Sequence, residues 1–392
     1  MDAYQALCCA AHGYPQVMQP LWPRLSATIR ATLHTPGGNV KALQAACKLL
    51  DALLRAVSGV LSQEAEGGEV NEGPENGRMG LREWEEALDI HLSVCTNHRA
   101  PTVGRSLACR PCRLKGSRAE VGWQVRAASL VCYAGLSAAV YWGLGEGRRE
   151  EVVRQLVRGR QGHHSARRSA SRRTSSLLPV LTWQCAGASL DDSPAVRSAA
   201  CRALGVVAAF PPSPPPQAQA AVMRACSDPF LSVRTTAVWA LASVCHRAAK
   251  GGWAEVAPLA NTALLAAAGT DPDKVLANSV RAVGHLAACV RLPGVGGEGE
   301  WMERAVQQLL GLLSSGNVKV QWNVCHALAQ MLQNPTLLLP QAAWAPSLFR
   351  NLVTLLGQTQ NYKIRIQCLG ALAVPCSKEG ERPHGRTVWN AH

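Results

Sequence analysis

The sequence predicts an all-α protein in which helix pairs stack as an α-solenoid, and three observations carry this prediction. One ten-residue phrase recurs with spacings of 37, 42, 45 and 44 residues, and its five copies start at Val196, Val233, Val275, Val320 and Ile364. The first, fifth, eighth and ninth positions are mostly small or apolar and lie on one side of a 3.6-residue helix. A second segment with an apolar stripe precedes the phrase. Because one helix pair cannot bury its apolar face alone, the period indicates stacked repeats.

The phrase is the inner helix of each pair, and turn residues mark where it begins. Asp, Asn, Gly or Pro precede the five copies and can cap the helix that follows, at 192–194, 228–229, 271–272, 316–317 and 360–361. Outer helices are predicted at 217–226, 298–314 and 342–356. The last two carry apolar stripes that include Trp301, Leu309, Trp344 and Leu352.

The length of the unit is that of HEAT or armadillo repeats, and its short turn favours the HEAT type. An arginine directly follows the anchor of three copies, at Arg197, Arg234 and Arg365. We expect these side chains to pair with turn carboxylates such as Asp228, and therefore to stabilise the fold.

The rest of the chain divides by composition. N-terminal helical segments are expected over 1–94, with an amphipathic helix at 39–57 and a mobile acidic loop at 62–77. The remaining divisions are a basic irregular loop at 95–118, a degenerate helical repeat region at 119–157, a disordered Arg/Ser-rich linker at 158–176, the HEAT-repeat domain of about five helix pairs at 177–376 and an irregular tail at 377–392.

The net charge of +14 is concentrated in two of these segments. Residues 95–118 and 158–173 each carry six Lys or Arg and no acid, so the rest of the chain is nearly balanced. Nucleic-acid binding would therefore depend on these two strips and not on the repeat surface. A solenoid associated with nucleic acid through the strips is kept as an alternative, although a protein partner is preferred.

The fifteen cysteines do not form a disulfide pattern. Those of the repeats lie singly inside helices, where Cys is a small apolar filler, and this favours a reducing compartment. The first residues lack a basic and an apolar signal region. We expect a cytoplasmic protein, with nuclear import as an addition. The uncharged stretch 127–145 has the length of a membrane span, but it is interpreted as a buried solenoid helix, and no span is expected.

One segment has the ligand types of a metal site. Cys95, His98, Cys109 and Cys112 form two pairs with spacings that a tetrahedral zinc site could use. The alternative is a basic loop with incidental thiols, because the hydrophobic framework of a zinc knuckle is nearly missing. No metal or cofactor is assigned.

The basic linker also offers modification sites. Hydroxyl residues follow paired arginines, as basophilic kinases require, and a phosphate there would reverse the local charge. The candidate phosphosites are Ser169, Ser171, Thr174, Ser175 and Ser176.

The repeats resemble a known family over 177–375. The strings PAVRSAACRALG, LSVRTTAVWALA, DPDKVLANSVRAVGHL, VKVQWNVCHALAQMLQNPTL and NYKIRIQCLGALAVP are similar to the central HEAT repeats of the HEAT repeat-containing protein 6 family. Residues 119–158 look like a shortened form of the helical region that precedes them there. The resemblance implies an intracellular solenoid scaffold without catalytic residues. Because the period is lost after 375 without a polar capping helix, a fragment or an alternative ending is expected.

The sequence contains no motif of a known catalytic site, so no enzyme is expected. Binding is assigned to the inner helices, whose seventh positions are expected to line the concave surface of the solenoid. The candidate partner-binding residues are Arg202, Trp239, Arg281 and His326, with Trp322 beside them at a third position. Arg and Trp dominate interface energetics, so we expect a non-enzymatic protein-binding scaffold without a small-molecule substrate. Burial of Trp239 and Trp322 between repeats, and an importin-like transport adaptor, remain alternatives.

Overall fold

The computed structural model describes residues 2–34, 39–65 and 185–380, except 209, 211–212, 249–252, 270 and 293–296. It also describes single positions at 86, 87, 90, 127, 128, 130 and 131. Helices and turns make up these parts, and no strand occurs in them. The segment boundaries expected between residues 66 and 184 lie outside the described residues.

The chain forms two compact units, Met1–Ala240 and Leu241–His392, and the division falls inside helix α12 (Leu231–Ala248). Unit 1 begins with α1 (Asp2–Gly13), α2 (Pro15–His34) and α3 (Val40–Ala65), which pack on one another. The face predicted for the helix at 39–57 is buried at Leu43, Cys47, Leu50 and Leu54. The helix continues to Ala65, into the expected loop, because the first Gly after position 59 comes only at Gly67.

The repeats of unit 1 consist of α10 (Pro194–Val207), α11 (Pro216–Ala225) and the first part of α12. Helices α10 and α11 pack against each other. Cys201 of α10, Ala225 of α11 and Val233 and Ala237 of α12 form a small core, which the partly buried Cys226 joins. Helix α11 is the shortest described α-helix of the repeats because Pro214 and Pro215 delay its start.

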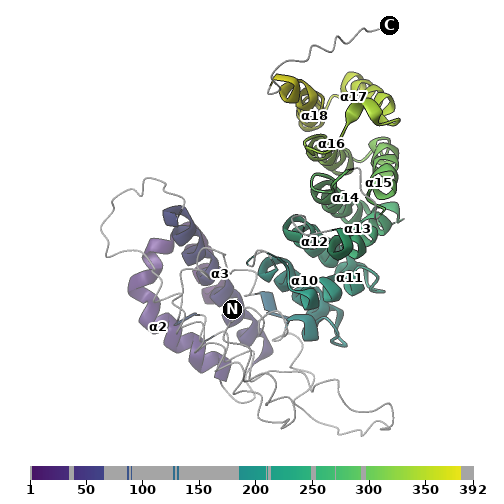
Figure 1. Ribbon diagram of the computed structural model, residues 1–392. Helices are drawn as coiled ribbons and strands as arrows, with labels where there is room; N and C mark the ends of the chain where they lie inside the picture. The colour runs from purple at the N-terminus through teal and green to yellow at the C-terminus, as the bar shows by residue number, and fades with distance from the viewer. Residues whose placement is uncertain are drawn as a thin grey trace, which may run out of the picture. The chain divides into compact units, whose positions relative to one another are not determined.

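Unit 2 contains three helix pairs after the end of α12. The outer helices are α13 (Trp253–Ala268), α15 (Glu298–Leu313) and α17 (Ala345–Gln358), and the inner helices are α14 (Asp273–Ala287), α16 (Val318–Leu332) and α18 (Tyr362–Gly380). A short 3-10 helix, η2 (Leu339–Gln341), precedes α17. Figure 1 shows the two rows, with α14, α16 and α18 stacked in one and α13, α15 and α17 in the other. The stacked pairs confirm the predicted α-solenoid.

The positions that the phrase predicted to be internal are buried in every copy, except that Leu372, at the ninth position of the last copy, is half-buried. All five anchors are inaccessible or nearly so, and so are the five alanines of the eighth position, Ala203, Ala240, Ala282, Ala327 and Ala371. The outer helices bury their predicted stripes as well, including Trp301, Leu309, Leu348 and Leu352. The 3.6-residue period therefore identified the core correctly.

The end of the described chain differs from the expected boundary. An irregular tail was predicted from 377, but α18 continues through Pro375 to Gly380. Proline at that point removes one backbone hydrogen bond, while Ile364, Cys368 and Ala371 anchor the preceding turns in the core. No described helix is long and apolar enough to cross a membrane.

Candidate functional site

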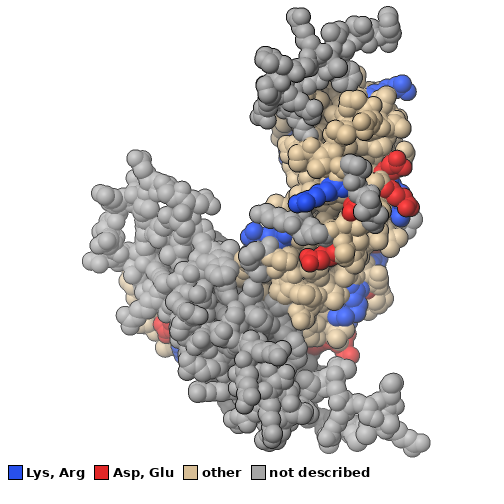
Figure 2. Space-filling model, viewed as in Figure 1, with Lys and Arg blue, Asp and Glu red and all other residues tan. Residues whose placement is uncertain are grey.

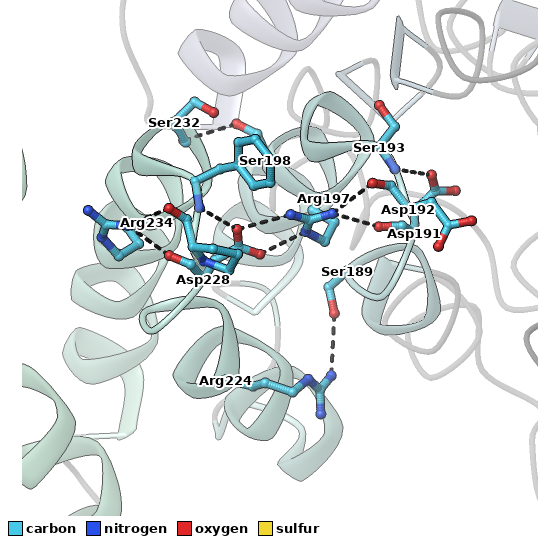
Figure 3. A network of polar contacts seen from close by, with 12 residues as sticks. Ser189, Asp191, Asp192, Ser193, Arg197, Ser198, Arg224, Asp228, Ser232 and Arg234 are labelled. Carbon is cyan, nitrogen blue, oxygen red and sulfur yellow. Dashed lines mark hydrogen bonds and ion pairs between the residues drawn. The ribbon is translucent and has the colours of Figure 1, made fainter. Parts of the chain in front are cut away.

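The turns before the inner helices carry an ion pair that ties neighbouring repeats together (Figure 3). The Arg197 guanidinium donates from Nε and Nη2 to Asp228 Oδ2 and Oδ1, at 2.7 and 3.0 Å. Its Nη1 donates to the backbone carbonyls of Asp191 and Asp192 at 2.9 and 3.0 Å. The hydrogen bond from Arg197 holds the pKa of Asp228 below its usual value.

This network fixes the connection between two helix pairs and confirms the expected pairing of Arg197 with Asp228. Arg234 repeats part of the pattern, because its Nη1 donates to the backbone carbonyls of Asp228 and Pro229 at 2.8 and 3.1 Å. The predicted caps are also present at Asn317, whose side chain accepts from the backbone N–H groups of Lys319 and Val320. These polar groups are engaged within the fold, so Arg197 and Arg234 stabilise the turns. The third predicted arginine, Arg365, is exposed.

In unit 1, the seventh positions of α10 and α12 form one contact. The Arg202 guanidinium carbon lies 4.5 Å from the centre of the Trp239 ring, a cation–π geometry. Arg202 is exposed and Trp239 is half-buried. A Cβ at Gly205 would be 2.7 Å from Trp239 Cζ3, so the glycine makes room for the indole between the two helices. The indole therefore packs between repeats while its face supports an exposed charge.

Beside this pair lies a polar contact between the same two helices. The hydroxyls of Ser198 and Thr236 are 2.8 Å apart, and Ser198 lies at the third position of its phrase. Both side chains are half-buried. The surface of unit 1 at these positions therefore combines a cation, an aromatic ring and hydroxyl groups.

In unit 2, Trp322 and His326, at the third and seventh positions of α16, contact each other. Their rings stack with centroids 6.4 Å apart and an angle of 12° between the planes. His326 Nδ1 lies 3.2 Å from Gln367 Oε1 on α18, so the imidazole also links two inner helices. Both Trp322 and His326 are half-buried.

Arg281 of α14 lies near a cluster of two histidines and a glutamine that come from three helices. The rings of His246 and His285 meet edge to face at 4.7 Å, and Gln330 Nε2 lies 3.3 Å from His285 Nδ1. Burial, followed by the charges of His246, Arg281 and His326, lowers the pKa of His285 to about 4. His285 is therefore neutral at physiological pH. A motif search could not find this cluster, because its members come from three helices.

The thiols of the repeats are not all separate. Cys325 and Cys368 are buried inside separate helices as predicted, but their Sγ atoms lie 3.3 Å apart, so these two thiols contact each other. The hydrogen bond with Cys368, followed by burial, raises the pKa of Cys325. Cys289 follows the end of α14 and is exposed, so it is not a helical filler. In the sequence, Cys325 is the sixth residue of its phrase and Cys368 is the fifth residue of the next. This pairing of positions was the signal that could have predicted their contact.

Several predicted sites fall outside the described residues. These are the zinc candidates Cys95, His98, Cys109 and Cys112, the hydroxyls at 169–176 and both basic strips. Within the described ranges, no group of three or more His, Cys, Asp or Glu could hold a metal ion. On the face seen in Figure 2, the described part of the repeats is mostly uncharged, and its Lys, Arg, Asp and Glu side chains are scattered.

Comparison with known proteins agrees with this architecture. Residues 178–284 match the family model for HEAT repeats. A chain in the structure in which Kap95p binding induces the switch loops of RanGDP to adopt the GTP-bound conformation is 14% identical, with a TM-score of 0.54. The match covers 96% of this chain and 40% of that one. Kap121p is 11% identical with a TM-score of 0.49, over 95% of this chain and 35% of that one.

A designed armadillo repeat protein in complex with the peptide (KR)4 is 15% identical with a TM-score of 0.43, over 78% of this chain and 98% of that one. At these identities a likeness extends to the fold alone. Residues 178–284 carry HEAT repeats, and the chain is an all-α solenoid of the HEAT and armadillo kind. Folds of this kind are typical of scaffolds that bind other proteins.

Proposed function

We propose that this HEAT-repeat chain is a non-enzymatic protein-binding scaffold that uses the exposed side of its inner helices. The observation that carries the proposal is the Arg202 guanidinium held over the Trp239 ring at 4.5 Å. The arginine is exposed, whereas its aromatic support is fixed between two helices. A cation positioned in this way is ready to meet a carboxylate of a partner without losing much further conformational freedom.

The chemistry of the surrounding positions indicates the kind of partner. No Asp or Glu occupies the third or the seventh position of any of the five phrases, whereas Arg202, Arg281 and His326 do occupy seventh positions. Arg and Trp are the residue types that carry most binding energy at interfaces. An extended or helical segment with acidic side chains is therefore the partner that suits this surface best.

We also propose the finer family assignment, to the HEAT repeat-containing protein 6 family. Its support is the set of phrase strings between 194 and 375, in which turns and helices match together. The assignment adds no catalytic residue to the chain. It is consistent with a scaffold whose specificity lies in surface positions of the repeats.

The experiment compares two charge reversals on exposed arginines. Arg202→Glu removes the cation from the Trp239 ring, and the control Arg304→Glu makes the same change on the outer helix α15. Binding of the full chain to arrays of acidic, neutral and basic peptides is measured, and the best peptides are titrated by fluorescence anisotropy. We expect Arg202→Glu to weaken binding of acidic peptides at least tenfold, while Arg304→Glu leaves it unchanged.

Equal binding by the two variants would contradict the proposed surface. Capture of basic signal-like peptides in place of acidic ones would favour the importin-like adaptor. Thermal melting of both variants is the folding control, because each substitution changes an exposed side chain and is expected to alter stability by no more than about 0.5 kcal/mol.

A further inference from the structure

The inner helices of unit 2 use the same positions to contact the helix that follows. Val280 and Cys325 hold the sixth position of their phrases and are fully buried. Cys325 Sγ lies 3.3 Å from Cys368 Sγ, which belongs to the fifth position of the next phrase. A Cβ at Gly284, in the tenth position, would lie 2.8 Å from Ala327 Cα of the next inner helix. In unit 1 the hydroxyl of Ser198, at the third position, lies 2.8 Å from that of Thr236 on the next inner helix. The third, sixth and tenth positions therefore face the next repeat.

In α18 no described residue covers the same positions. Ile366 is 59% exposed at the third position and Leu369 is 53% exposed at the sixth. Ala373 at the tenth is exposed too, and a Cβ at Gly370 would meet nothing within 4 Å. With Tyr362, which is 65% exposed, they form a stripe at 362, 366, 369, 370 and 373, one face of a helix. We call these five residues the α18 stripe.

The α18 stripe is complementary to itself when two copies run antiparallel. Its large side chains, Tyr362, Ile366 and Leu369, come first, and its small residues, Gly370 and Ala373, come last. A two-fold axis between residues 367 and 368 places Tyr362 opposite Ala373 and Ile366 opposite Leu369. A parallel pair would instead set Tyr362 against Tyr362 and leave a gap between the small residues.

The charges beside the stripe favour the same arrangement. Lys363 and Arg365 are exposed near the beginning of α18 and would lie side by side in a parallel pair. In the antiparallel pair, Lys363 lies opposite residue 372 and Arg365 lies opposite Gly370, so the two lysines are separated by about 13 Å along the axis and the two arginines by about 7.5 Å. The lysine separation exceeds the screening length of about 8 Å at physiological salt and the arginine separation is close to it, whereas a parallel pair sets both like charges side by side. The helix dipoles also oppose each other favourably.

We propose that the α18 stripe is a dimerisation surface on which α18 of a second copy docks antiparallel. The surface is distinct from the exposed side of the inner helices proposed for partner binding. One helix face buries less than the ~800 Å² per partner of a standard interface. The dimer is therefore weak and forms at chain concentrations of about 10–100 µM.

The test is analytical ultracentrifugation of the full chain over this concentration range. The weight-average mass is expected to rise from 41.7 kDa towards twice that value. Leu369→Glu or Ile366→Lys alone should weaken the dimer at least tenfold, because each buries an unpaired charge opposite an apolar side chain. The control Leu265→Glu changes a leucine of α13 that is 69% exposed outside the stripe, and should dimerise like the wild type.

A mixture of the two single variants tests the direction of the helices. Across an antiparallel pair, the lysine of Ile366→Lys faces the glutamate of Leu369→Glu, while the other Ile–Leu contact is kept, so an equimolar mixture should recover a heterodimer. A parallel pair offers no such contact, and failure of the mixture to associate overturns the proposal. So does a monomeric wild type at every concentration, which would leave the stripe to a helix of another protein. A dimer that Leu369→Glu does not weaken overturns it as well.

Discussion

The close approach of α14 to the backbone of α16 makes Gly284→Ala the most informative single change in the repeats. A Cβ on residue 284 would lie 2.8 Å from both Ala327 Cα and Ala327 Cβ, and 2.8 Å from Gln330 Oε1. An ordinary contact begins at 3.4 Å, so the added methyl is about 0.6 Å too close. Since one of the opposing atoms belongs to the backbone of α16, a side-chain rotation cannot relieve the contact, and the two helices have to separate.

The expected magnitude is the difference between two effects. Overpacking of a tight core contact costs about 1–3 kcal/mol. Replacement of glycine by alanine inside a helix stabilises by about 0.5–1 kcal/mol. The net result at Gly284 is therefore a loss of about 1–2 kcal/mol. Gly311 of α15 is the matched control, because a Cβ there meets nothing within 4 Å and only the gain applies.

Native-state hydrogen exchange followed by mass spectrometry measures the loss of stability helix by helix. Local measurement is needed because a stacked array of repeats need not unfold in one step. We expect amides of α14 and α16 to exchange about 5- to 30-fold faster in Gly284→Ala. Those of α15 should exchange more slowly in Gly311→Ala. The reasoning is refuted if both variants protect their helices equally, since the helix contact would then not depend on the missing side chain.

Two further predictions concern charged and titratable groups. Asp228→Asn removes the charge that the Arg197 guanidinium contacts at 2.7 Å, so the free energy of unfolding in denaturant should fall by about 2–4 kcal/mol. The control Asp192→Asn keeps the backbone carbonyl that Arg197 contacts, and should lower it by no more than about 0.5 kcal/mol. The pKa of His285, lowered from 6.5 to about 4, means that the unfolded chain takes up a proton before the folded chain does. Stability present above pH 6.5 should thus fall as the pH drops towards 4, by about 1–2 kcal/mol after allowance for solvent screening of the half-buried ring. His285→Gln should remove that part of the pH dependence, and an unchanged pH profile would contradict the assignment.

The sequence predicted those features of the fold in which every repeat has the same surroundings. The first, fifth and eighth positions are buried in all five copies, so one 3.6-residue pattern identifies them. No repeated pattern predicted helix α2. It contains Pro20 and Pro23, which are unfavourable inside a helix, and it lies outside the repeat period. Its buried stripe at Met18, Trp22, Leu25, Ile29 and Leu33 shows that packing outweighs the proline penalty.

The candidate site was less predictable, because its positions face a neighbouring repeat whose residue differs each time. The repeat period predicted that Arg202 and Trp239, both at seventh positions, lie on the same side of their inner helices. Their cation–π contact depends on Gly205, which lets the indole approach, and this can be known only once the two helices are placed together. The phosphosite and zinc predictions fall outside the described residues and stay predictions.

The sixth position of the phrase shows how the next repeat decides the surroundings of a side chain. Cys325 is buried because α18 follows α16, and Leu369 holds the equivalent position in α18 but is 53% exposed. Their different surroundings come from the neighbour and not from their own place on the helix. A substitution at the sixth position should therefore act on stability in α14 or α16 and on association in α18. Comparing Cys325→Glu with Leu369→Glu in one unfolding and one sedimentation experiment separates these two consequences of a single repeated pattern.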